Sequence, residues 1–368
     1  MLVNYDSLVN EMEVMQGVFV KGSSGAKNIY FHDGKLIAFS PLIMCKTAID
    51  YSDDFINCCL SFDALNKVIS GYSTLFYTKV SGVLFEQVGN AIKLTIHEEP
   101  KEEGYSSYAK VSTFFLDNIP TAQNALDNFN KEVPEDSEMV SGEEMEKYTK
   151  TLFPLLSNDA SGGAGKLSFA DDYVFFLSNT FSSFVKNDLP NSLKNLEISQ
   201  SGLSLIRKFF DRYESLQFGR NEGYLVVSSI DESLICNIRI NKLTFKHDKF
   251  VSGLCKDKGF VVNRRYFREV LNRLSNFSEQ VTVKCGNGEI FVDAKTFNQD
   301  VPLVAERGDI NELGFVANTN IFGKIILGSD DLMPEDAYVY LIDKGRNISV
   351  YITDSSGEWF SVTTIMKA

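Results

Sequence analysis

The chain has 368 residues, of which 44% are hydrophobic, 23% are charged and only 8 are prolines. This length allows two or three domains, and the composition excludes a chain that is mostly disordered. The formal net charge is −13, but residues 98–146 alone hold thirteen acidic and three basic side chains, which leaves about −3 for all the others. The acidity therefore belongs to one segment, and the rest of the chain can still carry a basic face.

One pattern recurs six times along the chain: a helix followed by short strands around a hairpin turn. The copies span residues 5–50, 57–98, 143–188, 195–241, 259–304 and 313–368. Their helices are predicted at 6–16, 63–70, 143–153, 201–215, 263–276 and 319–327. Their hairpin turns fall near residues 33, 89, 171, 222, 287 and 346, with one longer gap where the acidic segment 98–142 is inserted.

The copy at 259–304 shows the pattern most clearly. A strand at 259–262 leads to Asn263, a good N-cap for the helix that follows. Residues 280–285 alternate as a strand, the Gly-Asn-Gly sequence at 286–288 predicts a hairpin turn, and 289–294 form the return strand. The first copy is looser, with a helix at 6–16, then strands expected at 18–20, 29–31 and 36–39.

Consecutive copies pair into three domains of similar size. These are residues 1–130, with an acidic insertion or linker from about residue 98, then 140–248 and 256–368. Each domain should consist of two helices packed on antiparallel sheet, which makes the protein α+β, with three domains of two β-α-β-β-β half-units each.

The arrangement resembles the bacterial beta-type DNA sliding clamp, whose three domains each contain two such half-units. The stretches that carry the resemblance most specifically are 196–240, with its closing Leu-Ile-Cys-Asn-Ile-Arg-Ile strand, and 259–304. The C-terminal residues 359–368 are similar to the family's closing strand. Two features depart from it: Ile365 stands where the family has Pro, and the family's Thr-Asp-Gly is absent near 178–180. A divergent, bacteriophage version of the clamp would fit both departures.

The resemblance implies a function and a set of partners. A clamp is not an enzyme and needs no cofactor; it is a DNA polymerase processivity factor in DNA replication. Its helices line a central hole with the sheets outside, and two chains joined head to tail would form a homodimeric ring around double-stranded DNA. The ring would be loaded by a clamp loader and would tether a DNA polymerase without sequence preference.

Basic side chains on the outward faces of the predicted helices fit such a DNA-facing surface. In the helix at 263–276 the apolar positions recur at i, i+3, i+4 and i+7, and arginines take the other positions. The same holds for four more helices, whereas Glu11 and Glu13 make the outer face of the first helix acidic. The residues expected to face DNA are Arg264, Arg265, Arg268, Arg273, Arg207, Lys208, Arg212, Lys147, Lys150, Lys67 and Lys324. The alternative for any single helix is an ordinary solvated face.

The resemblance also implies a pocket for a short apolar peptide of the polymerase or the clamp loader, between the second and third domains. Carried over residue by residue, the pocket would contain Phe184, Leu243, Phe250, Val362, Thr364 and Met366. Methionine suits a surface that serves several partners, because its side chain is adaptable. Val362 and Phe250 are equally well explained as parts of an interdomain core.

Other readings of the sequence are less well supported. Residues 161–166 are similar to a phosphate-binding loop, but Leu167 replaces the Ser or Thr that would hold magnesium, so a hairpin loop is favoured. A phage structural protein of the tail or baseplate would not need basic faces on successive helices. A nuclease that uses the acidic segment lacks a compact group of carboxylates.

The remaining signals point to a cytoplasmic protein, or one in the host cytoplasm if phage-encoded. No basic stretch of a secretory signal is present near Asp6, and no run approaches the roughly 18 apolar residues of a membrane span. The six cysteines show no C-x-x-C pair and are expected as buried, inert thiols. His32, His97 and His247 have no ligand or triad spacing, so no metal site is expected.

Overall fold

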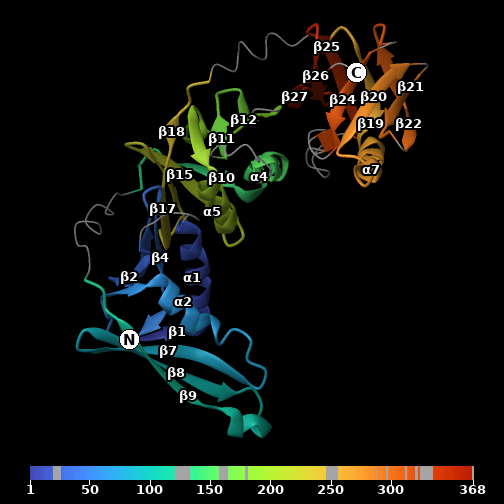
Figure 1. Ribbon diagram of the computed structural model, residues 1–368. Coiled ribbons are helices and arrows are strands. Elements are labelled where there is room, and N and C mark those ends of the chain that lie inside the picture. Colours follow the sequence, from blue (N-terminus) through green and yellow to red (C-terminus); the bar gives the residue numbers. More distant parts are fainter. Residues whose placement is uncertain are drawn as a thin grey trace. The chain divides into compact units, whose positions relative to one another are not determined.

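The computed structural model describes residues 1–19, 26–120, 133–156, 165–178, 181–245, 256–286, 288–295, 297–310, 313–319, 322–323 and 335–366. Contacts group the chain into two compact units. Unit 1 contains Met1–Gly142 and Ser201–Ile240, and unit 2 contains Glu143–Gln200 and Asn241–Ala368. Each unit is built on two antiparallel sheets (Figure 1). The division into three domains stays a prediction.

The elements repeat in the order β-α-β-β-β, as predicted (Figure 1). The first copy consists of β1 (Leu2–Asn4), α1 (Tyr5–Val18), β2 (Asn28–His32), β3 (Lys35–Phe39) and β4 (Ile43–Ala48), followed by the short β5 (Tyr51–Ser52). The second copy consists of β6 (Cys58–Ser61), α2 (Phe62–Ser70), β7 (Thr78–Val88), β8 (Ala91–Pro100), η1 (Glu103–Tyr108) and β9 (Val111–Asp117). The third copy consists of β10 (Glu138–Ser141), α4 (Gly142–Leu156), β11 (Lys166–Phe169), β12 (Tyr173–Leu177), β13 (Phe181–Lys186) and η2 (Asn191–Leu193). The fourth copy consists of β14 (Leu196–Ser199), α5 (Gln200–Phe210), β15 (Ser215–Asn221), β16 (Tyr224–Ser228), β17 (Leu234–Arg239) and β18 (Asn241–Lys242).

The last two copies keep the same order. The fifth copy consists of β19 (Gly259–Asn263), α7 (Arg264–Ser275), β20 (Gln280–Gly286), β21 (Glu289–Asp293), β22 (Asn298–Pro302) and β23 (Ala305–Arg307). The described strands of the sixth copy are β24 (Gly314–Asn318), β25 (Asp336–Asp343), β26 (Asn347–Thr353) and β27 (Trp359–Met366). The predicted helix at 319–327 lies largely outside the described residues; of its positions, Thr319, Phe322 and Gly323 are helical.

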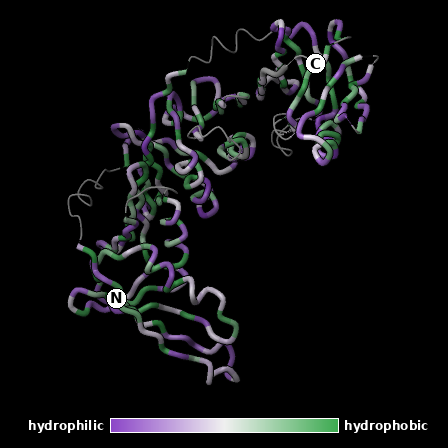
Figure 2. Tube along the Cα trace, viewed as in Figure 1, coloured by the Kyte–Doolittle hydropathy of each residue, from purple (hydrophilic) through white to green (hydrophobic). Residues whose placement is uncertain are grey.

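Turn and cap chemistry explains why the elements begin and end where they do. Asp33-Gly34 and Glu222-Gly223 have positive φ at both residues, which is the backbone of a tight two-residue hairpin (φ 48° and 76°, 39° and 87°). The strands around the first turn, β2 and β3, each have a buried middle and partly buried ends, and Figure 2 shows hydrophobic residues distributed along the strands of both units. At the start of α7 the Asn263 side chain accepts a hydrogen bond from the Tyr266 N–H at 2.9 Å, which confirms the predicted N-cap.

Unit 1 contains a sheet that joins strands from two distant parts of the chain. Its eight strands run in the order β10-β15-β16-β17-β4-β3-β2-β6. The join is the antiparallel pair β4–β17, in which Ile43 lies opposite Ile238 and Cys45 opposite Cys236. The second sheet of unit 1 has five strands, β5-β1-β7-β8-β9, and β9 is its edge.

Unit 2 repeats this construction. A ten-stranded sheet runs β18-β14-β11-β12-β13-β27-β26-β25-β19-β23, and its join is the antiparallel pair β13–β27. Inside this join the hydroxyls of Ser183 and Ser361 lie 2.7 Å apart and are buried, so each satisfies the other. A four-stranded sheet, β22-β21-β20-β24, completes the unit, with β22 at one edge.

Three elements differ from the sequence predictions. The strand expected at 18–20 is wrong, because α1 continues through Val18 and buries that side chain in its apolar face. The helix expected at 201–215 ends at Phe210, where Asp211 and Arg212 form a turn. The acidic segment 98–142 is not simply an insertion: it supplies the end of β8 and all of η1, β9 and β10.

Gly259 provides a test of how closely β19 and β25 are packed. A Cβ at this position would collide with the Val339 carbonyl oxygen and lie 2.8 Å from Cδ1 of Tyr340, so the backbone of β25 would have to shift. We expect Gly259→Ala to lower the free energy of unfolding by about 1–3 kcal/mol, measured by denaturant melting. Gly104→Ala is the matched control, because nothing lies within 4 Å of its added Cβ; equal stability of the two variants would contradict this packing.

Candidate functional site

Helix α7 carries the largest group of predicted DNA-facing arginines. Its buried residues include Phe267, Val270, Leu271 and Leu274, which confirms the predicted apolar stripe. Arg264, however, is only 1% exposed, so its expected orientation toward solvent is wrong. The reason is its position: Arg264 precedes Phe267 by three residues and Leu271 by seven, which places it on the apolar face.

The other arginines of α7 lie outside that face. Arg265 is exposed and Arg268 is partly exposed. Arg273 is exposed too, and its Nη2 lies 3.1 Å from Oε2 of Glu269 one turn earlier in the helix. Ion pairs of this kind on a helix surface contribute only about 0.3–0.5 kcal/mol, so they leave the side chains adaptable.

The cations at the end of α5 contact helix α1 within unit 1. Arg212 Nη1 lies 3.0 Å from Glu11 Oε1, and Arg212 also donates to the Asn10 carbonyl oxygen. Lys208 Nζ donates to the Glu13 carbonyl oxygen at 3.2 Å. Both residues are exposed, so they point away from the core as expected, but each also contacts α1. Arg207, in the last turn of α5, is exposed.

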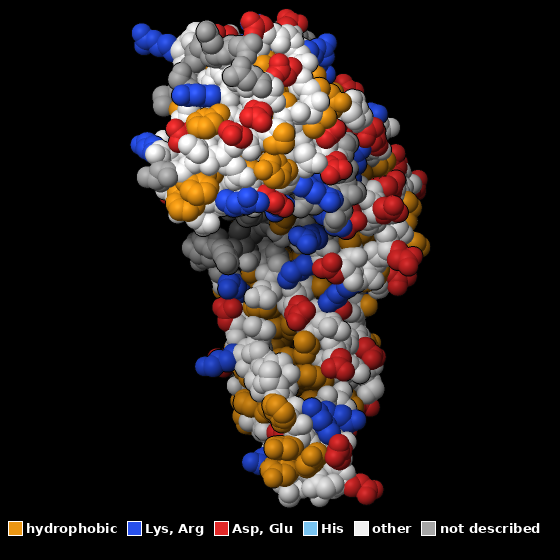
Figure 3. All heavy atoms as spheres, turned by 90° about the vertical axis from the view of Figure 1, so that its right-hand side faces the viewer, with side chains coloured by type: hydrophobic (Ala, Val, Ile, Leu, Met, Phe, Trp, Pro, Cys, Tyr) orange, Lys and Arg blue, Asp and Glu red, His pale blue; other side chains and the backbone are white. Residues whose placement is uncertain are grey.

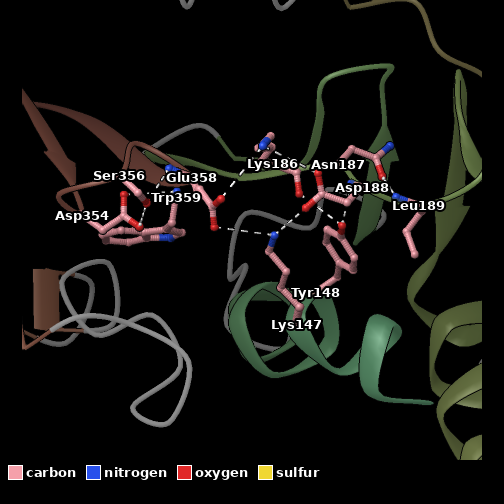
Figure 4. Close-up of polar contacts among 10 residues, drawn as sticks. All are labelled: Lys147, Tyr148, Lys186, Asn187, Asp188, Leu189, Asp354, Ser356, Glu358 and Trp359. Carbon is pink, nitrogen blue, oxygen red and sulfur yellow. Dashed lines mark hydrogen bonds and ion pairs between the residues drawn. The ribbon is translucent and has the colours of Figure 1, made fainter. Parts of the chain in front are cut away.

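Lys147 on α4 is the centre of a charged network in unit 2 (Figure 4). Its Nζ lies 2.9 Å from Asp188 Oδ2 and 4.0 Å from Glu358 Oε2. Lys186 reaches the same two acids at 3.8 and 3.9 Å. The network connects α4 and the end of β13 with the turn before β27. Lys147 is therefore a structural ion-pair partner in addition to any contact with DNA.

The remaining predicted cations are less constrained. Lys67 on α2 is exposed. Lys150 pairs with Glu146 one turn earlier on α4. Lys324 lies outside the described residues. The exposed or partly exposed cations on described helices thus come from α2, α4, α5 and α7.

A second candidate site is an apolar cluster on the ten-stranded sheet of unit 2. Phe184 on β13 stacks on Phe360 of β27 with ring centroids 4.5 Å apart, and Phe175 stacks on Phe184 at 5.2 Å. The buried members of the cluster are Ala170, Phe175, Phe184, Tyr340, Tyr351, Phe360 and Val362. Partly buried side chains pack on it: Tyr173, Leu177, Leu243, Phe245 and Tyr338. This group is called the aromatic strip below.

The aromatic strip contains three of the six predicted pocket residues. Phe184, Val362 and Leu243 belong to it. Phe250 and the side chains of Thr364 and Met366 lie outside the described residues. The tyrosines and Phe360 were missed, although their alternation at 338 and 340 in β25 and at 360 and 362 in β27 marks one face of the sheet.

The described residues show no sign of a metal or thiol site. No group of three or more His, Cys, Asp or Glu that could hold a metal ion is found in them. Five cysteines are buried and free, as predicted; Cys255 lies outside the described residues. Burial raises the pKa of Cys58 and of Cys285 to about 12, which leaves their thiols protonated and unreactive at neutral pH. Within the described part of the chain, no helix is both long and apolar enough to cross a membrane.

Tyr148 provides a test of the network around Lys147. Its hydroxyl accepts from the Asp188 N–H at 2.9 Å and donates to the Lys186 carbonyl oxygen at 3.1 Å, and burial raises its pKa to about 12. We expect Tyr148→Phe to lower the free energy of unfolding by about 1–3 kcal/mol.

The same residue predicts a pH dependence. A pKa that is raised in the folded state stabilises the fold below the unfolded value of 10.0 and loses that contribution as pH rises toward 12. The stability difference between the wild type and Tyr148→Phe should therefore be constant below pH 10 and shrink above it, measured by urea unfolding at each pH. A difference that does not change in that range would contradict a buried, hydrogen-bonded Tyr148.

No protein-family model matches the chain, and no curated protein matches it by sequence. Solved structures match over its whole length. A DNA polymerase III beta subunit of Eubacterium rectale has a TM-score of 0.74 at 12% identity and covers 100% of this chain and 98% of its own. The corresponding subunit of Thermotoga maritima has a TM-score of 0.71 at 13% identity, with 100% and 98% covered.

A further match is a beta clamp of Helicobacter pylori bound to a DNA ligase peptide, with a TM-score of 0.70 at 14% identity and 100% and 99% covered. These full-length similarities confirm the α+β class and the clamp fold that the sequence predicted. At such low identity they establish architecture alone. The chain therefore has the fold of the bacterial DNA polymerase III beta subunit, the sliding clamp.

Proposed function

We propose that this protein is a non-catalytic sliding clamp: a ring of two chains, joined head to tail, that encircles duplex DNA and tethers a DNA polymerase. The observation that carries the proposal is the sheet arrangement. The eight- and ten-stranded sheets each combine strands from four copies of the repeat, across the joins β4–β17 and β13–β27, whereas the five- and four-stranded sheets each contain strands from only two copies. An incomplete sheet at each end supports closure by a second copy.

The edges of these two short sheets have the side chains of an interface. On β9, Val111 and Phe115 are both 62% exposed. Figure 3 shows exposed hydrophobic side chains gathered in its lowest part, the part of unit 1 where Figure 1 labels β7, β8 and β9. Beside β22, Phe277 and Phe297 stack in parallel at 5.0 Å and are 57% and 46% exposed. Exposed apolar groups at a strand edge favour pairing with another chain.

The DNA-facing surface of the ring would be formed by exposed helix cations, above all Arg207, Arg265 and Arg268. Arginine and lysine contact phosphates without reading bases, so such a surface supports binding that has no sequence preference. Loading by a clamp loader and tethering of a polymerase both require a docking surface. We assign that role to the outer layer of the aromatic strip, because its inner residues are buried; the outer layer consists of the partly buried Tyr173, Leu177, Leu243, Phe245 and Tyr338. The beta clamp of Helicobacter pylori, solved with a DNA ligase peptide, supports a peptide-docking role for a protein of this fold.

Assembly is tested by light scattering. We expect the wild type to be a dimer at micromolar concentration. Phe115→Asp and Phe297→Asp should each raise the dimer dissociation constant by about thirtyfold or more, because a charge would be buried at the paired edges. Ile230→Asp is the control, since Ile230 is 67% exposed in the β16–β17 turn and should have no effect. A wild type that remains monomeric would contradict the proposed ring.

DNA encirclement is tested with a polymerase on primed circular template. Replacing Arg207, Arg265 and Arg268 with Glu should reduce product length about tenfold or more, because phosphates would meet acids in place of bases. The control variant reverses three exposed cations outside the helices, Lys79, Arg239 and Lys344, and changes the net charge equally. Equal processivity of the two variants would remove these helix faces from the DNA surface.

A further inference from the structure

Four aromatic side chains from two connections of unit 1 form a cluster that is open to solvent. Tyr77, just before β7, stacks on Tyr108 of η1 with ring centroids 4.8 Å apart, and it packs against Tyr105 at 5.0 Å. Phe76 lies beside Tyr77, at 6.3 Å. Phe76 is 87% exposed, Tyr77 47% and Tyr108 51%. These four residues are called the tyrosine platform below.

Backbone contacts hold the tyrosine platform in place. The Lys101 N–H donates to the Tyr77 carbonyl oxygen at 3.0 Å, and the Lys101 ammonium donates to the Leu75 carbonyl oxygen at 2.7 Å. Side chains three residues apart lie above one another in a 3-10 helix, so Tyr105 and Tyr108 share one side of η1. The rings are therefore arranged before a partner arrives, which lowers the entropy cost of binding.

The charges around the tyrosine platform are mainly acidic. Glu102 and Glu103 are exposed at the N-terminal end of η1, and among the described residues neither forms an ion pair. Two of the cations nearby are engaged: Lys79 pairs with an acid of β8, and Lys101 is bonded to a carbonyl oxygen. Lys110 is exposed beyond the other end of η1. One end of the platform thus offers two free carboxylates beside aromatic rings.

We propose that the tyrosine platform docks a segment of a partner protein in which an arginine stands next to an apolar residue. The guanidinium stacks on an outer ring face of the Tyr77–Tyr108 pair and donates to Glu102 or Glu103. The apolar residue covers Phe76. The platform belongs to unit 1, whereas the aromatic strip belongs to unit 2. The inference therefore goes beyond the proposed function and does not rest on it.

The chemistry of the platform favours this occupant. Exposed aromatic groups mark interaction sites, and tyrosine and arginine contribute much of the binding energy at protein interfaces. A planar guanidinium can stack on a ring and form two parallel hydrogen bonds with a carboxylate, which the ammonium of lysine cannot do. Sites for single-stranded nucleic acid combine stacking rings with a positive groove. Here phosphates would meet Glu102 and Glu103.

The test selects displayed random peptides on the full-length protein and on two variants. One variant is Phe76→Ser, and the other is Glu102→Gln with Glu103→Gln. We expect the wild type to enrich peptides with an arginine next to an apolar residue. Phe76→Ser should lose this enrichment, and the double variant should keep the apolar residue without the arginine.

Matched controls change exposed residues elsewhere in unit 1. Ile230→Ser removes an apolar side chain that is 67% exposed, and Glu13→Gln with Glu232→Gln removes two exposed carboxylates. Both controls should enrich the same peptides as the wild type. Peptides that bind another surface, such as the aromatic strip, would be enriched equally on Phe76→Ser and are recognised in this way.

The strongest peptide that depends on Phe76 and its Arg→Lys twin are then compared by fluorescence anisotropy. The twin should bind the wild type about tenfold more weakly, and the Glu102/Glu103 variant should bind both forms equally. The absence of any peptide that depends on Phe76 would overturn the inference. Arginine enrichment that persists in the Glu102/Glu103 variant would overturn it too.

Two further measurements test the other occupants. Light scattering that shows a weaker dimer for Phe76→Ser than for Ile230→Ser would place the platform between copies of this chain and overturn the inference. A single-stranded oligonucleotide that binds the wild type and is lost in Phe76→Ser would also overturn it. Failure of the proposed ring is distinguishable, because it appears as a monomeric wild type, whose selected peptides would still depend on Phe76.

Discussion

Backbone pairing between strands that are far apart in the sequence is the interaction on which the rest of the structure depends. The pair β13–β27 brings together residues such as Ser183 and Ser361, which are 178 positions apart, and β4–β17 does the same in unit 1. Each copy of the repeat alone would leave an open strand edge, which is a site of uncontrolled association. Pairing an edge of one copy with an edge of a later one removes that hazard and makes the sheets long.

The same pairing builds the aromatic strip, the proposed partner surface. Phe184 and Phe360 stack only because register places them opposite each other across the join, and the Lys147–Asp188–Glu358 network closes the end of that join. Each ion pair between side chains this exposed contributes little to the free energy of unfolding. The network therefore acts mainly by fixing the positions of α4, the end of β13 and the turn before β27. A surface that depends on two separate parts of the chain is sensitive to the geometry of the join, and this suits a site where partners must dock in one orientation.

Local features of the fold could be predicted from the sequence, and long-range ones could not. The hairpin at Glu222-Gly223 and the N-cap at Asn263 follow from the chemistry of neighbouring residues, so both were correct. Counting positions would also have placed Arg264 on the buried face. By contrast, the contact of Arg212 with Glu11 and the strand β9 inside the acidic segment depend on parts of the chain that no local pattern relates. For the aromatic strip, the resemblance supplied Phe184 and Val362, but their neighbours required the strand register.

The contacts that the helix cations make within the protein affect how such a protein would hold DNA. Lys147, Lys208 and Arg212 contact other parts of the protein, and Arg264 is buried, so fewer cations are available for phosphates than the sequence suggests. Each phosphate contact adds to affinity and to its salt dependence, so a small set gives weak, rapidly exchanging binding. In an enclosing ring, weak contact is an advantage, because retention then comes from closure and motion along the duplex meets little resistance. The stability of the proposed closure at β9 and β22 would therefore decide residence on DNA, more than any arginine on a helix.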